Sequence, residues 1–561
     1  MSPATPTHPA TPGLLARERT IAAPGFNRWL VPPAALCIHL CIGMAYGFSV
    51  FWKPLEGALR DADGKPIALC AAGATDFGDK FAGTLRALTA TDCNWSQFDL
   101  GWMYTFFFVV LGGSAALWGG WLERVGPRKA AFVATLCWCG GLLFSALGVH
   151  LHQLWMLWLG AGVVGGIGLG LGYISPVSTL IKWFPDRRGL ATGMAIMGFG
   201  GGAMIGSPLA TALMGFFGST DSTGVRETFV ALALIYLVFM LIGTFGYRIP
   251  APGWTPAGWS PPATAGQMIS THHVHLGNAH RTPQFWLLWV LLCMNVSAGI
   301  GIIGAASPML QETFGGALAD APGLAWSAVR QDPALAAAAA GVAAGFVGLI
   351  SLFNIFGRIG WASLSDLIGR RRTYTLFFVA GAVLYVGAAL AAGHKSLLPF
   401  VVALCLIASM YGGGFATIPA YLADIFGTQF VAAIHGRMLT AWSVAGVLGP
   451  ALVNYLHDTR VAAGVAGDAV YGPILHLMAA MLVVGLVANL LIRPVDARWH
   501  MSDAELAALR TAQGKAPGDA ATLARAEAAK FRLFAFWLVV LLPLGWGIWK
   551  TVQKALAMLQ W

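Results

Sequence analysis

The chain has 561 residues, of which 57% are hydrophobic and only 10% are charged. An ordinary soluble domain carries roughly 25% charged residues. The composition therefore excludes a water-soluble globular fold, a disordered chain and a disulfide-stabilised scaffold. The formal net charge of +10 does not indicate a nucleic-acid partner, because in a membrane protein a surplus of Lys and Arg is explained by cytoplasmic loops.

A membrane-spanning helix needs about 20 mostly apolar residues. Twelve runs meet this requirement, and a thirteenth follows a polar stretch. The runs are 29–53, 100–121, 130–150, 154–181, 189–217, 228–248, 284–310, 336–363, 374–393, 397–423, 434–456, 470–492 and 531–549. This pattern predicts an all-α membrane protein with twelve core spans and one extra C-terminal span.

The basic residues in the short loops predict the orientation. They gather in three loops. The loop after span 2 has Arg124, Arg128 and Lys129, the loop after span 4 has Lys182, Arg187 and Arg188, and the loop after span 8 has Arg370, Arg371 and Arg372. The turn after span 3 has none, and the turn after span 9 has only Lys395. We therefore expect a multi-pass protein of the bacterial inner membrane with a cytoplasmic N-terminus. The thirteenth span then places the C-terminus outside, although Lys550 and Lys554 do not favour that side.

The eight cysteines indicate no metal site, because no pair has zinc-ligand spacing with a histidine pair. Six lie in apolar runs and are expected to be small core residues. Cys70 and Cys93 both lie in one long polar loop. If that loop is periplasmic, the two can form a disulfide.

The two halves of the chain repeat each other. Asp366 follows Glu123 by 243 residues, within similar stretches of carboxylate, Gly and Arg. Pro419 in span 10 follows Pro176 in span 4 by the same 243 residues. Six spans separate the copies, so the repeat is parallel, and a cavity is expected between the halves at mid-depth.

These observations divide the chain into six parts. They are a cytoplasmic tail (1–28), an N-terminal six-helix bundle (29–248), a cytoplasmic central loop (249–282), a C-terminal six-helix bundle (283–493), a cytoplasmic polar segment (494–530) and an additional transmembrane helix with its tail (531–561).

The loop after span 2, Gly119-x-x-x-Glu123-Arg124-x-Gly126-x-Arg128-Lys129, resembles the signature of the major facilitator superfamily. A second copy lies at Ser365-Asp366-x-x-Gly369-Arg370-Arg371. A carboxylate at a helix end with an Arg cluster can form a cytoplasmic latch that breaks as the halves rock. The alternative is plain positive-inside anchoring. The latch residues would be Glu123, Arg124, Arg128, Asp366, Arg370 and Arg371.

Further motifs are similar to the oxalate:formate antiporter family. They are the span 1 stretch 40–51, Phe184-Pro185-Asp186-Arg187-Arg188-Gly189, the span 8 stretch 354–361 and Gly412-Gly413-Gly414-Phe415. The resemblance covers all twelve core spans and implies small carboxylates such as oxalate, formate, lactate or pyruvate as substrates. The thirteenth span resembles a small accessory membrane subunit fused to the transporter.

Arg358 in span 8 is the leading candidate for binding the substrate. An ionisable side chain inside a span is costly and suggests a function, and a guanidinium can grip a carboxylate with two parallel hydrogen bonds. The apolar middles of the twelve spans contain no Asp or Glu to pair with it. Asn354, one turn earlier on the same face, could orient the guanidinium.

The resemblance implies that dicarboxylate carriers of the family have a second cation, a Lys in span 11. In this chain that position is Trp442, so the second cation is missing. A monocarboxylate, or a dianion that enters with a proton, therefore fits the charge better than oxalate alone. His39 in span 1 could supply charge when protonated, or it could be a neutral core histidine bonded to the backbone. Tyr46, Tyr411, Phe415 and Trp442 could form an aromatic box, or could simply fill the membrane core.

We therefore predict a secondary transporter of small organic anions that works by alternating access, either as anion exchange or as proton symport. The expected partners are a carboxylate, protons and membrane lipid, with no nucleic acid and no cofactor. A carboxylate-sensing receptor is the alternative, but the chain lacks a recognisable output domain. An enzyme is not expected, because the sequence offers no HExxH motif, no GxSxG elbow and no Walker A loop.

Overall fold

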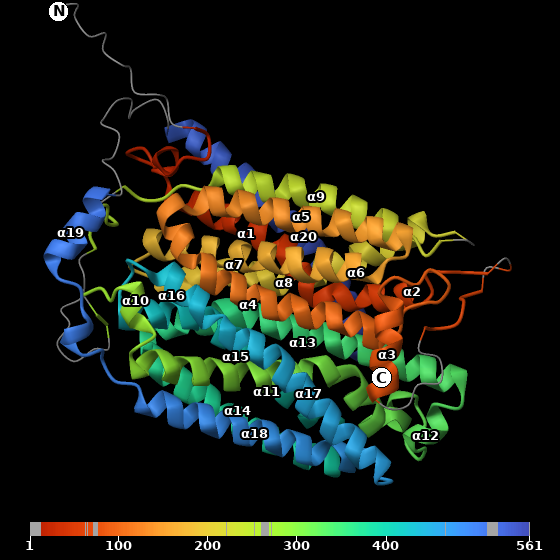
Figure 1. Ribbon diagram of the computed structural model, residues 1–561. Coiled ribbons are helices and arrows are strands. Elements are labelled where there is room, and N and C mark those ends of the chain that lie inside the picture. The colour runs from red at the N-terminus through yellow and green to blue at the C-terminus, as the bar shows by residue number, and fades with distance from the viewer. Residues whose placement is uncertain are drawn as a thin grey trace, which may run out of the picture.

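The computed structural model describes residues 13–61, 63, 65–70, 77–219, 222–251, 253–259, 269–270, 272–465, 467–512 and 526–559. Parts of the expected N-terminal tail, central loop, polar segment and C-terminal tail lie outside the described residues. Thirteen helices in the described chain are long and apolar enough to cross a membrane. They correspond one to one with the thirteen expected spans, and they run side by side through the molecule (Figure 1).

The N-terminal half provides the first six spans. They are α1 (Val31–Ile42) continued by η3 (Gly43–Phe51) and α2 (Trp52–Glu56), α4 (Gln97–Val125), α5 (Pro127–Leu151), α6 (Leu154–Leu157) continued by the π-helical η4 (Trp158–Val164) and α7 (Gly165–Trp183), α8 (Arg188–Phe217) and α9 (Val225–Gly246). The short helix α3 (Phe77–Ala87) lies in the long loop between the first two spans.

The C-terminal half provides the next six. They are α11 (Pro283–Leu318), α13 (Pro333–Ile368), α14 (Arg370–Gly393), α15 (Leu397–Phe426), α16 (Val431–Met438) with α17 (Thr440–Ala462), and α18 (Asp468–Leu491). Short helices α10 (Leu276–Ala279) and α12 (Trp326–Val329) precede α11 and α13, and α19 (Asp503–Ala512) precedes the last span, α20 (Ala526–Leu559).

The two halves repeat the same packing, as the sequence repeat predicts. In the N-terminal half α1 packs on α8 and α9, α4 on α7, and α5 on α7 and α9. In the C-terminal half α11 packs on α17 and α18, α13 on α15, and α14 on α15 and α18. Between the halves, α8 packs on α13, and α4 packs on α16 and α17. The halves therefore meet along α4, α8, α13, α16 and α17, and the cavity expected from the repeat would lie at this seam.

The repeated loop motif has a structural reason for its glycine. Gly126 joins α4 to α5 with φ of 88°, and Gly369 joins α13 to α14 with φ of 89°. Such positive φ values are costly for residues with a Cβ. The helix then restarts within one residue, so that the carboxylate and the Arg residues of each motif lie at a tight turn.

The ends of several spans differ from the expected ranges. The seventh span reaches Leu318 rather than 310, and the last helix extends through 526–559 rather than 531–549. Only Leu439 separates α16 from α17, and its N–H still bonds to the carbonyl of His435 at 3.0 Å. These differences arise because helices continue beyond the apolar stretch into the loops.

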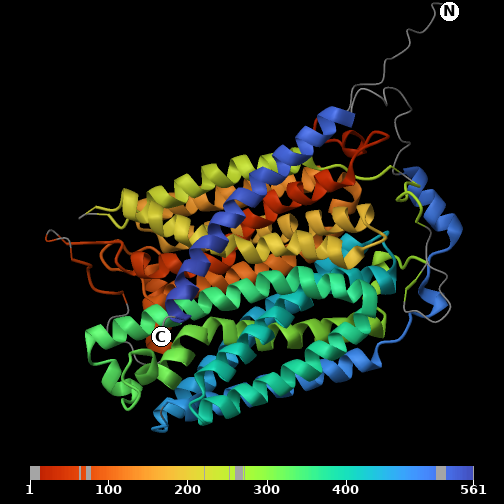
Figure 2. The same ribbon diagram turned by 180° about the vertical axis from the view of Figure 1, so that it is seen from behind.

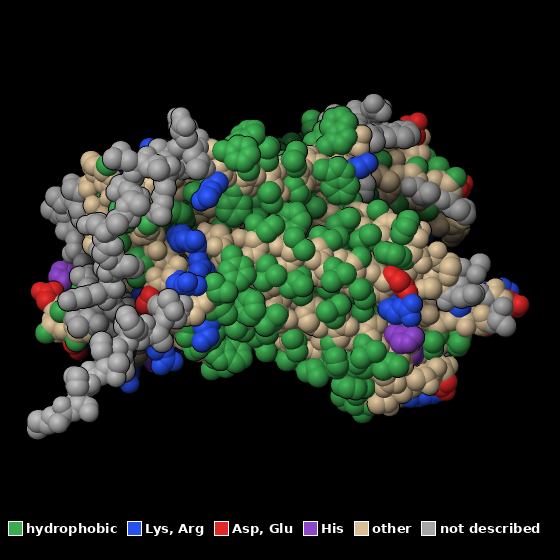
Figure 3. Space-filling model, turned by 90° about the horizontal axis from the view of Figure 1, so that it is seen from above, with side chains coloured by type: hydrophobic (Ala, Val, Ile, Leu, Met, Phe, Trp, Pro, Cys, Tyr) green, Lys and Arg blue, Asp and Glu red, His purple; other side chains and the backbone are tan. Residues whose placement is uncertain are grey.

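The outer surface fits a membrane. Exposed large hydrophobic side chains such as Leu117, Leu136, Val238 and Val383 cover the spans. Figure 3 shows one face with a broad hydrophobic middle and with Lys and Arg toward its ends. We call the side where α4 ends the basic face. The opposite side is the disulfide face, because Cys70 and Cys93 form a disulfide there, with their Cα atoms 4.9 Å apart.

Helix α20 crosses the outside of the seam between the halves, as Figure 2 shows from behind. It packs on α1 and α8 of one half and on α13 of the other. Val540 and Leu544 join a buried cluster with Leu36, Met197 and Ile355. The helix thus buries apolar surface that belongs to both halves.

Deleting residues 526–561 tests whether α20 is an appendage. We expect a folded, monodisperse twelve-span core whose melting temperature falls by a few degrees, because the deletion exposes one face of the seam. Size-exclusion chromatography and thermal unfolding in detergent measure both properties. Recovery of only aggregated protein would show that α20 is integral to the fold.

Candidate functional site

Arg358 lies in α13 at the centre of the molecule and is fully buried. Its Nε donates to Oδ1 of Asn354 at 3.1 Å, and its Nη1 donates to the backbone carbonyl of Ile196 in α8 at 3.2 Å. Its Nη2 has no hydrogen-bond partner, and no described carboxylate pairs with the guanidinium. The charge is thus oriented by both halves but is not neutralised.

Aromatic rings surround this guanidinium. Its Cζ lies 5.6 Å from the ring centroid of Phe415 and 5.9 Å from that of Phe199. Trp442 joins these two rings to Tyr173, with centroid distances of 4.8 Å to Phe415, 5.4 Å to Phe199 and 5.4 Å to Tyr173. These five side chains come from α7, α8, α13, α15 and α17, and we call them the central box.

Donor groups of the central box lack partners. Besides Nη2 of Arg358, the Nε1 of Trp442 and the Oη of Tyr173 are buried without a hydrogen bond. Each such group costs about 1–3 kcal/mol when it is left unsatisfied. Buried N–H and O–H donors beside an uncompensated cation are suited to bind a small anion.

Two tyrosines close the box toward the disulfide face. The hydroxyl groups of Tyr46 in η3 and Tyr411 in α15 lie 3.1 Å apart, which joins the two halves by a hydrogen bond. Tyr46 packs edge-on against Phe199 at 4.9 Å, and Tyr411 packs against Phe415 at 5.4 Å. These contacts link η3 of one half to α15 of the other beside the central box.

His39 lies beside the box rather than inside it. Its Nδ1 is 2.5 Å from the carbonyl of Ala195, and its Nε2 is 3.2 Å from the carbonyl of Tyr173. Its ring stacks on Tyr173 at 5.3 Å. The ring is therefore bonded to the backbone through at least one N–H, because a neutral imidazole has one donor and a protonated ring has two.

Close helix approach sets the geometry at Arg358. A Cβ added to Gly200 in α8 would lie 2.9 Å from the Arg358 Nε. The glycine lets α8 pass directly over the guanidinium, so that the Ile196 carbonyl and the Phe199 ring both reach it. No sequence motif on its own shows this contact.

On the basic face, a carboxylate from each half caps a helix of the other half. Asp366 of α13 accepts the backbone N–H groups of Gly189 and Leu190 at 2.8 and 2.9 Å, at the start of α8. Glu123 of α4 accepts the N–H of Ala432 at 3.2 Å, at the start of α16. Negative charge is stabilised at a helix N-terminus, so both contacts hold the halves together.

Ion pairs strengthen these caps. Glu123 also binds Lys182 of α7 at 3.0 Å. Arg370 bridges Asp366 at 2.5 Å and Asp424 at 3.2 Å, and Asp424 binds Arg188 of the other half at 2.7 Å. All four links use partly or fully buried groups, which salt screens less than it screens surface pairs.

Two of the six expected latch residues, Glu123 and Asp366, contact the other half directly. Arg370 supports them from within its own half by binding Asp366 and Asp424, and the other three take no part. Arg128 donates to the carbonyls of Leu14 and Tyr247, inside the N-terminal half. Arg371 donates to the carbonyl of Leu490, inside the C-terminal half. Arg124 borders a hollow with residues 13–18.

Sequence reasoning did not assign Arg188 and Asp424 to the latch or Tyr173 and Phe199 to the box. Asp424 is the carboxylate in the last turn of α15, and Arg188 stands in the Asp186-Arg187-Arg188-Gly189 motif. Its place at the end of a span, like that of Glu123 and Asp366, could have identified Asp424 as a latch residue. Nothing in the sequence distinguishes Phe199 from other aromatic residues of the spans, because its role comes from packing.

Outside the spans, Arg28 binds Asp186 through two hydrogen bonds of 2.7 and 2.9 Å. Burial alone would raise the pKa of Asp186, but the hydrogen bonds from Arg28 hold that pKa below its ordinary value. The pair therefore stays charged at neutral pH, and it ties the start of the first span to the loop between α7 and α8.

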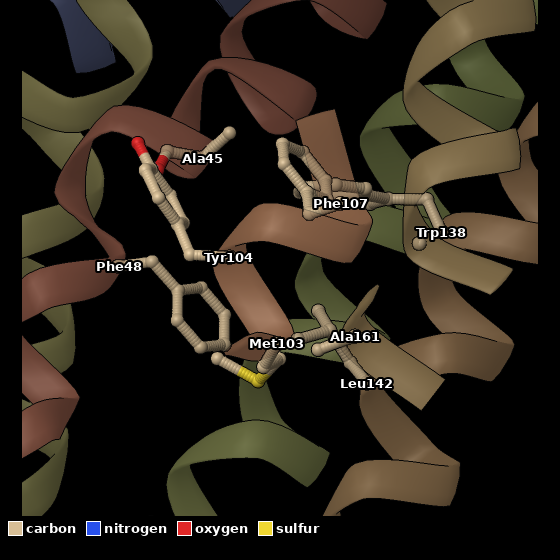
Figure 4. A pocket seen from close by; sticks show the side chains of 9 residues that line it. Ala45, Phe48, Met103, Tyr104, Phe107, Trp138, Leu142 and Ala161 are labelled. Carbon is tan, nitrogen blue, oxygen red and sulfur yellow. The ribbon is translucent and has the colours of Figure 1, made fainter. Parts of the chain in front are cut away.

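A small cavity lies elsewhere, inside the N-terminal half between η3, α4, α5 and η4 (Figure 4). Phe48, Met103, Phe107 and Trp138 line it, and the Tyr104 hydroxyl donates to the carbonyl of Ala45 at 3.3 Å. Its volume of about 20 Å³ suffices for about one water molecule. It lacks a charged lining residue and is a packing void rather than a carboxylate site.

Comparison with known proteins places this architecture among transporters. The family model of the Major Facilitator Superfamily matches residues 68–450. The chain is 27% identical to the oxalate:formate antiporter of Oxalobacter formigenes, over 62% of this chain and 73% of that protein. It is also 27% identical to the MFS-type transporter YhjX of Escherichia coli, over 60% of this chain and 73% of that protein.

Solved structures show the same fold. The proton:xylose symporter XylE superposes with a TM-score of 0.56 at 14% identity, over 82% of this chain and 94% of that one. FucP in its outward conformation superposes with a TM-score of 0.53 at 14% identity, over 82% of this chain and 99% of the FucP chain. The family match and the thirteen candidate spans define a multi-pass membrane transporter. The chain belongs to the Major Facilitator Superfamily.

Asp366→Asn should weaken closure of the basic face, because the amide carries no charge for the start of α8 or for Arg370. Spin labels at the exposed positions Lys129 and Arg372, one in each half, report the separation by pulsed electron resonance. We expect the variant to add or enlarge a longer-distance population. Asp496→Asn, on an exposed pair with Arg498, is the matched control; identical distributions in all three proteins would contradict the latch.

Proposed function

We propose that this protein is a secondary transporter that moves small carboxylates across the membrane by alternating access. The single observation that carries the proposal is the Arg358 guanidinium, which is fully buried between the halves, has no described carboxylate partner and has an unpartnered Nη2. A substrate carboxylate would neutralise this charge and accept hydrogen bonds from donors that have no protein partner.

The lining of the central box supports a small, flat anion. Phe199, Phe415, Trp442 and Tyr173 enclose the guanidinium, while Asn354 orients it. Rings of this kind exclude water and strengthen the electrostatic attraction between the guanidinium and a carboxylate. A box with one fixed cation neutralises one negative charge, so it favours a monocarboxylate or a dicarboxylate that enters with a proton.

Relatives carry substrates of this chemistry. Their names include an oxalate:formate antiporter, the apicoplast pyruvate carrier 1 of Toxoplasma gondii and human monocarboxylate transporter 11. The common feature of these substrates is a carboxylate on a small carbon skeleton. We propose the same class here, moved by exchange or with a proton. Nothing in the fold or the relatives favours the receptor alternative.

The closed basic face suggests how loading would drive the cycle. Asp366, Glu123 and Asp424 hold the halves together there, and the hydroxyl pair of Tyr46 and Tyr411 closes the other side. We propose that the basic face is cytoplasmic and that the N-terminus lies on that side of a bacterial inner membrane. An anion on Arg358 would shift the balance between the two closures by its different affinity for each state.

Arg358→Gln should reduce carboxylate uptake into proteoliposomes by about 100-fold or more, since removing one partner of a buried charged pair costs about 2–5 kcal/mol. Arg358→Lys should also fail, because an ammonium cannot reproduce the two parallel hydrogen bonds. Labelled formate and pyruvate measure uptake, and Arg498→Gln on the exposed surface is the control. Uptake at the unaltered rate by folded Arg358→Gln would refute the proposal.

Trp442→Lys should shift the preference toward dicarboxylates by about tenfold or more, because it adds a second fixed charge inside the box. Competition of unlabelled oxalate against labelled formate measures the ratio. Trp442→Phe, which removes the indole N–H without adding charge, separates the effect of charge from that of volume. An oxalate-to-formate ratio that is equal in both variants would contradict this account of the box.

A further inference from the structure

His435 is a second buried histidine near the central box. It lies in α16, is 1% exposed and comes seven residues before Trp442 on the same span. Neither ring nitrogen has a hydrogen-bond partner. Most buried polar atoms in proteins are bonded, so a ring whose two nitrogens both lack a protein partner is available to bind a further group.

The ring lies between the central box and the basic face. Its centroid is 5.9 Å from that of Tyr173, the box residue whose Oη is also unpartnered. Helix α16 packs on α4 and α7 of the other half. A Cβ added to the neighbouring Gly436 would lie 2.2 Å from the carbonyl of Ala115, so α16 is held tightly against α4 at this level.

The acidic groups on the helices around α16 are already bonded. Asp99, at the opposite end of α4 from Glu123, accepts hydrogen bonds from Thr84 and Ser96, and the others form ion pairs. The partners are Lys182 for Glu123 of α4, Arg188 and Arg370 for Asp424 of α15, and His457 for Glu312 of α11 and Asp458 of α17. Tyr173 of α7 faces the ring, and Arg437 of α16 itself binds the Leu276 carbonyl and His280 of the α10 segment. His39 and Arg358 add two basic groups around the box. None of these groups offers a free negative charge to His435.

A charge on a buried ring without a counter-ion is costly. A carboxylate in the central box would provide that counter-ion. Arg358 balances one negative charge, so a dianion would leave a second charge for the imidazole to balance. Histidine is the side chain whose ordinary titration range makes such a conditional charge possible.

We infer that His435 is the site at which a proton binds together with the carboxylate, and that it serves as a second, conditional cation for dianions. The inference rests on the proposed function of the central box. The proton comes from solution, forms the second N–H of the ring, and leaves when the anion leaves. Because linkage is reciprocal, the anion must raise proton affinity by the same factor by which the proton raises anion affinity.

Binding of labelled oxalate to the purified full chain tests this between about pH 8 and about pH 5, a range that brackets histidine titration. If one proton binds with each oxalate, the affinity of the wild type for oxalate should increase as the pH falls, by up to about tenfold per pH unit. A pH-indicator dye should record uptake of about one proton per oxalate bound. In His435→Gln the affinity should change by less than about twofold per pH unit, and proton uptake should disappear.

Matched variants distinguish the two buried histidines near the central box from a histidine elsewhere. His476→Gln, on the exposed side of α18, should keep the wild-type slope and the proton uptake. His435→Lys should bind oxalate without a pH slope, because its charge is fixed. Loss of the slope in His39→Gln together with its retention in His435→Gln would overturn the assignment.

Measurements on the wild type alone also decide the question, even where a variant does not fold. Oxalate binding without proton uptake, or binding of formate but never of oxalate, would overturn the role of His435 while leaving the proposed transport of carboxylates standing. If neither oxalate nor formate nor pyruvate binds at any pH, the proposed function fails, and this inference fails with it.

Discussion

The arrangement of the centre of this protein depends on one positive charge. That charge lies where the two halves meet, and no described negative charge of the protein pairs with it. The Arg358 guanidinium is bonded by Asn354 of its own helix and by the Ile196 carbonyl of α8. Burying a charge without a counter-ion is costly, so stability by itself gives no reason to keep it. The surrounding rings and unpartnered donors are explained by the proposed binding of an anion to Arg358. The free energy of anion binding then differs between conformations of the protein that bind the anion tightly and those that bind it weakly.

The same two helices carry both the site and the closure of the basic face. At its start α8 is capped by Asp366 of α13, and two to three turns later its Ile196 carbonyl and Phe199 ring contact Arg358 of α13. A change in the packing of α8 on α13 therefore alters the cap and the guanidinium together. Contiguous packing of this kind gives a short physical route by which loading of the site and opening of the basic face can influence each other.

Helix α20 lies against that same seam from outside. Leu544 contacts the position of Gly201, next to the Gly200 that approaches Arg358, and Trp537 donates to the Trp29 carbonyl at 3.2 Å near the basic face. Its contacts with α1, α8 and α13 mean that any rocking of the halves must also move or bend this helix. The thirteenth span thus covers the membrane side of the helices that hold Arg358.

Hydropathy, loop charges and the 243-residue repeat were sufficient to predict the thirteen spans and the two matching halves, because a bilayer demands long apolar helices and a repeat implies equivalent packing. Arg358 could be singled out because a charge within a span is conspicuous, and Asn354 because helical spacing places it one turn away. The tertiary structure alone decided that Phe199 and Tyr173 enclose the cation, that Asp424 and Arg188 join the halves, and that His435 is left without a partner. These contacts join residues tens to hundreds of positions apart, and apolar or aromatic spans look alike in sequence whether they face lipid, core or cavity.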